Sequence, residues 1–401
     1  MRSETLFGLC SIALATAVLH AEDFVDRVDE ALTVSAAKGR FRARVSGTLD
    51  LEYYHLDQPT SGLIDTKRHD LFNPRLTLFL DAQLGPHLYA FVQSRVDRGF
   101  DPSDDGARMR LDEYALRYTP WDDGRMSVQI GKFAPVIGNW MSRHLSWDNP
   151  FVTAPIPYDY VTAVSDIEVA KSKPDFIAGQ SSGSYEYNPI IWSAAYGTGI
   201  SVSGQIGKFE YAAEAKNAAL SSRPESWDAT DTGLDHPTVN ARVGIRPNHL
   251  WRLGFSASYG PYLRKETETN LPSGRGMSDY HQMLLGQDIS FEWHHLQIWA
   301  EVYESRFQVP NVGNADTLAY YLEVKYKFTP ELFGALRWNQ QLFSDLSDGS
   351  AWGRDVWRMD AAIGYRFTPH TQLKLQHSLE HETSGPHGYR NTFAAQFTLR
   401  F

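Results

Sequence analysis

The sequence predicts an all-β chain that closes into a transmembrane antiparallel β-barrel of about sixteen strands. Apolar and polar residues alternate with period two in many segments, short turns alternate with longer polar loops, and aromatic residues collect where the segments end. No stretch after the N-terminus approaches the roughly 18 uninterrupted apolar residues of a membrane helix. The mean hydropathy of −0.39 still allows a barrel, because its strands present apolar residues to lipid only at every second position.

Residues 1–21 have the organisation of a secretory signal peptide. Arg2 precedes an apolar run from Leu6 to Leu19, and the small residue Ala21 follows. The single cysteine, Cys10, lies inside this segment, so the mature chain would carry no thiol. We therefore expect a signal peptide at 1–21 and export to the outer membrane of a Gram-negative type of cell envelope.

Residues 22–38 form a separate N-terminal segment before the first predicted strand. Phe24, Val28 and Leu32 stand at helical spacing, which favours a short periplasmic helix that caps one rim. A loose tail is the alternative. The barrel itself is expected to occupy residues 39–401.

The C-terminal segment shows the alternation most clearly. Phe393, Ala395, Phe397, Leu399 and Phe401 share one face, and Thr392, Ala394, Gln396, Thr398 and Arg400 share the other. Reading backwards in this way predicts tight turns near 85–87, 120–124, 207–208, 247–249, 293–295, 329–331 and 368–370. Longer loops are predicted near 56–72, 100–106, 134–198, 217–236, 261–279, 306–316, 343–354 and 382–390. Short turns on one rim and long loops on the other are the plan of an outer-membrane barrel.

The charged residues of the predicted strands indicate what the barrel contains. A sixteen-stranded barrel is wide enough for an aqueous lumen, and charge is costly against lipid, so charged residues at alternate positions belong inside. This rule predicts a basic pore wall of Arg42, Arg44, Arg75, Arg95, Arg125, Arg242, Arg252, Arg337 and Arg358. Acidic residues such as Asp50, Glu301 and Asp360 have the same parity, so the lumen is expected to be mixed in sign.

The predicted loop at about 134–198 is far longer than the others. It follows the fifth strand and is the third loop on its rim. Loops of this length are usually functional or disordered, and its aromatic and proline residues favour an ordered segment. We expect it to fold inward as a constriction loop that sets acidic groups opposite the arginine wall. These acidic residues are Asp148, Asp159, Asp166, Glu168 and Asp175.

The stretch from Asp112 to Gly138 resembles the fourth and fifth strands of porins of the phosphate-selective O/P type. Gly131-Lys132-Phe133 would end a strand, and Pro135 and Gly138 would open the long loop. The resemblance implies an outer-membrane porin and a homotrimer of barrels. The family's basic residue after the phenylalanine is replaced by Ala134, which argues against a lysine-lined phosphate path.

These observations favour a porin that lets small hydrophilic solutes or ions diffuse through a water-filled channel, with outer-membrane lipid around it. A receptor or structural barrel without steady conductance is the alternative, and a barrel hydrolase is a further one. Arg143-His144, Ser146 and Asp148 supply catalytic residue types, but a triad is defined by geometry rather than by proximity in sequence. We expect no enzyme, cofactor or metal site. The net charge of −10 argues against a nucleic-acid partner.

Overall fold

The computed structural model describes residues 31–66, 68–97, 108–179, 187–383, 385 and 388–401, so the predicted signal peptide lies outside the described residues. The strands are β1 (Thr33–Ala36), β2 (Phe41–Leu56), β3 (Asp70–Leu84), β4 (Leu88–Asp97), β5 (Arg108–Tyr118), β6 (Ser127–Phe133), β7 (Gly197–Ile206), β8 (Phe209–Lys216), β9 (Thr238–Ile245), β10 (Trp251–Pro261), β11 (His281–Trp293), β12 (Leu296–Val309), β13 (Gly313–Lys327), β14 (Leu332–Phe343), β15 (Val356–Thr368), β16 (Thr371–Glu382) and β17 (Tyr389–Arg400).

Helices in the described residues are short. They are α2 (Lys173–Gly179), α3 (Ala229–Thr232) and the 3-10 turns η1 (Ala37–Gly39), η2 (Met141–Arg143), η3 (Ile156–Tyr158), η4 (Pro224–Ser226), η5 (Lys265–Asn270) and η6 (Met277–Asp279). None of the helices described is long and apolar enough to cross a membrane.

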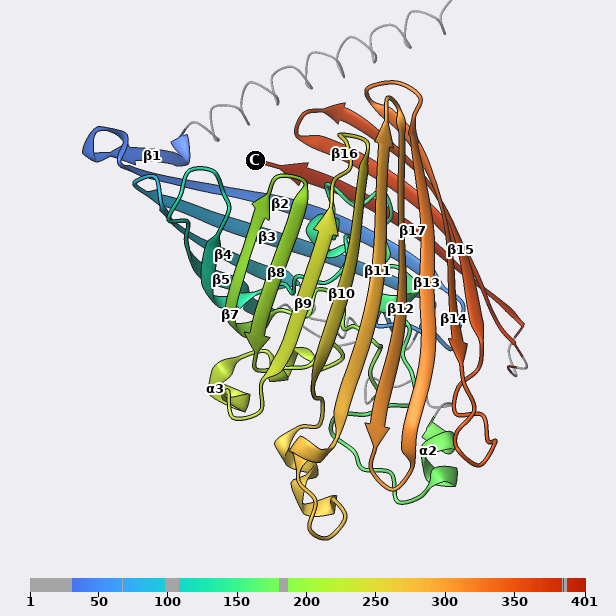
Figure 1. Cartoon of the computed structure of the whole chain (residues 1–401). Helices are drawn as coiled ribbons and strands as arrows, with labels where there is room; N and C mark the ends of the chain where they lie inside the picture. Colours follow the sequence, from blue (N-terminus) through green and yellow to red (C-terminus); the bar gives the residue numbers. More distant parts are fainter. Residues whose placement is uncertain (1–30, 67, 98–107, 180–186, 384, 386–387) are drawn as a thin grey trace, which may run out of the picture.

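The strands β2–β17 close into an antiparallel barrel. Each pairs with its neighbours in the chain, and β17 pairs with β2 from Thr392 opposite Leu56 to Arg400 opposite Thr48. Phe401 completes the seam, because its backbone N–H and C=O both bond to Gly47. In Figure 1 the C-terminus and β1 lie at the rim with the short turns, and α2 and α3 lie at the opposite rim with the long loops. The predicted barrel and the predicted asymmetry of its rims are confirmed.

Alternation along each strand separates an apolar outside from a polar inside. On β14, Leu336 is 60% exposed, whereas Arg337 and Asn339, which have the opposite parity, are buried. On β17, Phe393 is 51% exposed, and Gln396 and Thr398 are buried. Exposed apolar side chains suit lipid, so the buried polar side chains define the lumen.

Exposed aromatic side chains mark both rims of the apolar surface. Near the turns they are Tyr118, Trp121, Trp293, Tyr326, Phe328, Tyr365 and Phe367, and near the loops they are Tyr53, Tyr259, Trp338 and Tyr389. Amphipathic rings favour the two headgroup layers of a bilayer. Their two bands therefore bracket the membrane-facing surface.

The predicted long loop at 306–316 is wrong. β12 continues to Val309 and β13 starts at Gly313, so only a tight turn joins them. The polar residues that suggested a loop face outward on the strands, where Arg306 and Asp316 pair across them at 2.7 Å. The hydrogen-bond ladder between β12 and β13 thus continues beyond the apolar band. Polar side chains on this part of the strands are exposed to water without a loop.

The segment 22–38 is described only in its second half. Thr33–Ala36 form strand β1, which pairs antiparallel with the first residues of β2, from Thr33 opposite Arg44 to Ala36 opposite Phe41. Residues Thr33–Ala36 thus extend the sheet beyond the C-terminal end of β17. Phe24 and Val28, on which the predicted helix rests, lie outside the described residues.

The segment 134–196, called the long loop below, joins β6 to β7 and packs against lumen-facing side chains. Ile137, Tyr158, Ile190 and Trp192 are fully or almost fully buried. They belong to one hydrophobic cluster with residues of the inner face of the wall, including Leu284, Tyr303, Phe307, Ala315 and Tyr321. The side of the lumen next to β11–β13 is therefore filled like the core of a globular protein.

Carboxylates of the wall accept hydrogen bonds from the outgoing limb of the long loop. Ala134 donates its backbone N–H to Glu113 (2.8 Å), Val136 to Glu214 (3.3 Å), Trp140 to Glu301 (2.8 Å) and Asn139 also to Glu301. The hydroxyl of Tyr158 bonds to the other Glu301 oxygen at 2.6 Å. An irregular backbone removed from water must find such partners, and acidic side chains supply them here.

Cations of the wall donate hydrogen bonds to the next limb of the same loop. The Lys374 ammonium donates to the carbonyls of Ser146 (2.7 Å), Asn149 (2.9 Å) and Phe151 (3.1 Å). Arg337 donates to the Thr153 carbonyl at 3.0 Å and to that of Ala154 at 3.3 Å, and Arg358 also donates to Ala154. Gln376 accepts from the backbone N–H groups of Val152 and Thr153. The wall of β14–β16 thus holds residues 146–154 in place.

Replacing Lys374 by methionine tests this anchoring. Three buried carbonyls would lose their donor, and we expect local opening of residues 146–154 to become easier by about 3 kcal/mol. Limited proteolysis of the folded barrel should then cleave within this segment much faster than in the wild type. Lys327→Met is the matched control, because Lys327 lies half-buried at the turn end of β13. Equal cleavage rates for Lys374→Met and the wild type would contradict the anchoring role.

Replacing Leu336 by arginine tests the assignment of the outer face. Leu336 is exposed in the middle of β14, and a cation facing lipid there should lower the free energy of unfolding by about 2–4 kcal/mol. Denaturant titration in lipid vesicles measures this loss, and Leu336→Phe controls for the change in size. An unchanged unfolding free energy would mean that this face does not meet lipid.

Candidate functional site in the barrel lumen

A cavity of about 140 Å³ lies between the long loop and the wall formed by β2–β5, and we call it the central cavity. The wall contributes Arg75, Arg95 and Arg110, together with Glu52 and Asp97, and the long loop contributes Asp159. Trp140, His144, Tyr158 and Phe151 supply aromatic surface from the loop. Three cations and three carboxylates therefore line one small space, in which neither sign dominates.

Ion pairs fix these charges against one another. Arg75 contacts Glu52 at 2.5 Å and Asp50 at 3.2 Å, and Arg110 contacts Asp97 at 2.8 Å. Arg95 and Arg110 both contact Asp112, at 2.8 and 3.0 Å. Such pairing holds each guanidinium in one geometry while some of its charge still faces the cavity. The wall therefore presents paired positive and negative groups to the central cavity.

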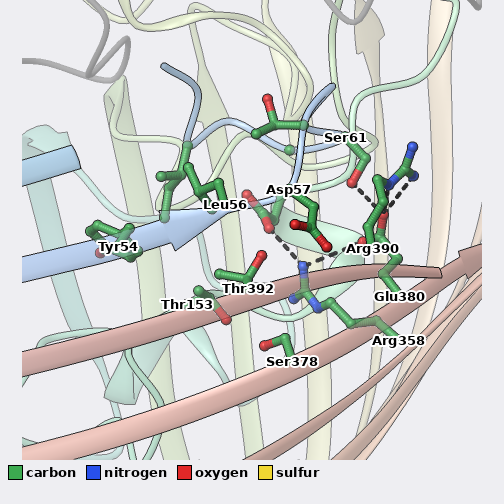
Figure 2. Close-up of a pocket in the computed structure, with 14 residues that line it drawn as sticks. Tyr54, Leu56, Asp57, Ser61, Thr153, Arg358, Ser378, Glu380, Arg390 and Thr392 are labelled. Carbon is green, nitrogen blue, oxygen red and sulfur yellow. Dashed lines mark hydrogen bonds and ion pairs between the residues drawn. The ribbon is translucent and has the colours of Figure 1, made fainter. Parts of the chain in front are cut away.

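A smaller pocket of about 50 Å³ adjoins the central cavity toward the loop rim. Tyr54, Ile64 and Asp159 line both spaces. Figure 2 shows Arg358 and Arg390 converging on this pocket, with Glu380 between them. Arg358 pairs with Asp159 at 2.9 Å, so a wall cation and a long-loop carboxylate meet here.

The segment 57–69 after β2, called the first loop, closes one side of this pocket. Ser61 donates to Glu380 at 2.5 Å, and the backbone N–H of Leu63 bonds to Asp159. Asp57 accepts hydrogen bonds from the backbone and the side chain of Asn391, and these bonds hold the pKa of its carboxyl below the usual value. The first loop is thereby fastened to the seam of the barrel and to the long loop.

A third space of about 450 Å³ lies on the turn side of the long loop and is called the turn-side cavity. It is lined by residues 134–138 of the loop and by Glu210, Arg242 and Arg252 of the wall. Met141 and Ser142 face this space, whereas Trp140 and His144 face the central cavity. The short helix η2 therefore stands between the two spaces.

The residues of the predicted basic wall lie in several different environments. Arg75 and Arg95 line the central cavity, Arg242 and Arg252 line the turn-side cavity, and Arg358 lines the pocket near the loop rim. Arg337 is fully buried between Glu323, Asp360 and the loop backbone, so it anchors the loop instead of facing solute. Arg42 and Arg44 are exposed at the turn end of β2. Arg125 lies in the turn after β5, paired with Asp123 and stacked over Trp121.

The predicted acidic residues of the long loop are not gathered opposite the arginines. Asp159 meets the wall through Arg358, but buried Asp166 pairs with Arg223 of another loop at 2.7 Å. Glu168 and Asp175 are exposed, and Asp175 accepts a hydrogen bond from the backbone of Lys171 beside α2. Asp148 is exposed near the turn side of the lumen. The structure thus brings one loop carboxylate of this set to an arginine of the predicted wall.

Several residues of the site were absent from the sequence-based set, notably Arg110, Asp97, Asp112 and Lys374. A register shift between Gln93 and Ser94 puts Asp112 and Glu113 on the same face, so parity counted from the end of β5 misses Arg110. The alternation of Met109 and Leu111 with Arg110 and Asp112 was the signal that could have shown it. Lys374 stands between Leu373 and Leu375, a pattern that marks it as inward-facing.

No family model matches the sequence, and no curated protein matches it. Solved structures do match over most of the chain. An anion-selective porin from Comamonas acidovorans has a TM-score of 0.58 at 10% identity, covering 90% of this chain and all of that one. OmpF of Salmonella typhi, solved with daunomycin, has a TM-score of 0.57 at 10% identity, covering 92% of this chain and 100% of that chain.

A third similar structure is the outer-membrane channel DcaP of Acinetobacter baumannii. Its TM-score is 0.56 at 10% identity, and the match covers 92% of this chain and 99% of that chain. At such low identity the likeness concerns the fold. The closed sheet, the exposed apolar band and these matches agree: the chain is an outer-membrane β-barrel with the fold of porins.

Proposed function

We propose that this protein is a porin that lets small hydrophilic solutes or ions diffuse passively across the outer membrane. The signal peptide at residues 1–21 would direct export, and three barrels would assemble as a homotrimer in the lipid, as the resemblance to phosphate-selective O/P-type porins suggests. One of the similar structures, OmpT of Vibrio cholerae, is described in a trimer form.

The observation that carries the proposal is the central cavity. Arg75, Arg95 and Arg110 face Glu52, Asp97 and Asp159 across a space with aromatic and amide side chains. Polar solutes keep hydrogen-bond partners in such surroundings, whereas apolar solutes do not. With equal numbers of cations and carboxylates, the cavity favours weak ion selectivity over strict preference for phosphate. The proposed path runs from the loop rim through the central cavity, past η2 and into the turn-side cavity.

We further propose that the chain is not an enzyme. The ring nitrogens of His144 contact the carbonyl of Met141 at 2.6 Å and the hydroxyl of Tyr196 at 2.6 Å, so His144 does not act on Ser146. Among the described residues, no group of three His, Cys, Asp or Glu side chains could hold a metal ion. These contacts give His144 a structural role.

A receptor or structural barrel is the second candidate, and one observation favours it. The hydrophobic cluster beside β11–β13 fills part of the lumen, and the first loop packs against the long loop. If these loops moved so as to fill the rest of the lumen, the barrel would not conduct steadily. Its exposed rim would then serve to bind a partner.

Planar-bilayer recording separates the two candidates. The wild-type barrel should give steady single-channel steps, and deletion of residues 155–180 should raise the conductance because it removes part of the long loop from the lumen. A folded wild-type barrel without steps would overturn the porin proposal. Unchanged conductance after the deletion would remove this part of the loop from the path.

Two single substitutions test whether the central cavity sets ion preference. Arg110→Gln should shift the reversal potential in a salt gradient toward cation preference, and Asp97→Asn should shift it toward anion preference. We expect each permeability ratio to change by roughly twofold, because water and salt screen one charge in an open path. The two substitutions neutralise the two partners of one ion pair. Both therefore break the pair, and only the sign of the charge that is lost differs between them. Identical reversal potentials in all three proteins would place the path elsewhere.

A further inference from the structure

Two lumen-facing arginines differ from those around the central cavity because no described carboxylate lies within ion-pair distance of them. Arg366, at the turn end of β15, uses Nε to donate to Gln372 at 3.0 Å, and Arg400, at the end of β17, uses Nε to donate to the Pro369 carbonyl at 2.9 Å. Among the described residues, neither forms an ion pair within 4.0 Å, and neither uses its terminal nitrogens in a hydrogen bond. The N–H groups on the two terminal nitrogens of each guanidinium group are therefore available as donors.

Both guanidinium groups lie over the same indole ring of the long loop. The Arg400 carbon Cζ is 4.1 Å from the centre of the Trp147 ring, and that of Arg366 is 5.0 Å away. Trp147 is itself only 8% exposed, and Lys374 holds the carbonyls of Ser146 and Asn149 on either side of it. Stacking on a fixed ring holds two like charges near each other in a defined geometry.

The surroundings of the pair are cationic. Arg44 acts on Arg400 electrostatically, and Lys325 is close enough to Arg366 to feel its charge. The one carboxylate that acts on both arginines is exposed Asp148. This contrasts with the central cavity, where carboxylates contact every arginine of the lining. Repulsion within the cluster would be relieved by an anion that accepts hydrogen bonds from both guanidinium groups.

We propose that Arg366 and Arg400, stacked over Trp147, form an oxyanion-binding site on the turn side of the long loop. Its ligand is the carboxylate or phosphate group of a small solute, bound by the terminal N–H groups of both arginines. The site rests on the proposed channel for its role in transport, where it would hold anionic solutes at the periplasmic end of the path. Binding itself can be measured without any current.

Calorimetry on the folded, detergent-solubilised barrel at low salt tests the site, with inorganic phosphate and acetate as separate probes. The wild type should bind at least one probe, and the probe that binds identifies the source of the oxyanion. Arg366→Gln and Arg400→Gln should each weaken binding by roughly tenfold, as expected for the loss of a charge-assisted contact. Lys327→Gln is the control, because it removes a positive charge from the same end of the barrel at a residue outside the site.

Two results would overturn the site: absence of binding of both probes to the folded wild type, or equal weakening by Lys327→Gln and the two arginine variants. A current measurement separates the site from the channel proposal. If the wild type conducts chloride but neither phosphate nor acetate reduces the current from the turn side, the site fails and the porin proposal stands. If the wild type binds a probe but gives no channel steps, the porin proposal fails and the site stands.

Discussion

The structure depends on one requirement, that backbone groups taken out of water must find hydrogen-bond partners. A barrel wall satisfies its own backbone through the ladder between strands, but an irregular segment inside the barrel has no ladder. In the long loop, wall carboxylates accept from the N–H groups of Ala134, Val136, Asn139 and Trp140. Wall cations donate to the carbonyls of Ser146, Asn149, Phe151, Thr153 and Ala154. Buried charged side chains of the lumen thus form the backbone hydrogen bonds that secondary structure would otherwise provide in this segment.

The path of the loop determines which charged side chains face the open part of the lumen. Glu301, Glu323 and Arg337 are almost completely buried among loop atoms and other charges, so their contribution is to position the loop. Arg75, Arg95 and Arg110 remain at the edge of the central cavity because the loop does not cover the wall of β2–β5. The side filled by the hydrophobic cluster and the side left open therefore follow from the same loop conformation.

The sequence was sufficient for the barrel and for much of the loop arrangement. Alternation such as Phe393 to Phe401 requires only local residue order, and it correctly predicted strands, parity and the seam strand β17. It failed at 306–316, because Glu304, Arg306 and Asp316 are polar but remain in strands outside the apolar band. It also missed Arg110, because a register shift in one strand pair changes parity without changing composition.

The candidate site was harder to predict than the fold. The set of inward arginines was largely available from parity, but their partners were not, since Arg358 meets Asp159 and Asp166 meets Arg223 only through the path of the loops. Whether an arginine faces solute or anchors backbone depends on that path, as the contrast between Arg75 and buried Arg337 shows. The parity of a position along its strand predicts that an arginine faces inward. The packing of the loops determines whether that arginine lines a cavity or binds loop backbone.

Hydrogen exchange of individual backbone amides in the folded wild-type barrel tests this account most directly. The N–H groups of Ala134, Val136, Trp140, Val152 and Thr153 have wall side chains as acceptors, so they should be protected nearly as well as strand amides. The amides of the exposed residues Ser273 and Gly274, in the loop between β10 and β11, give the reference for rapid exchange. Exchange of the long-loop amides as fast as that reference would contradict a loop held inside the barrel by charged side chains.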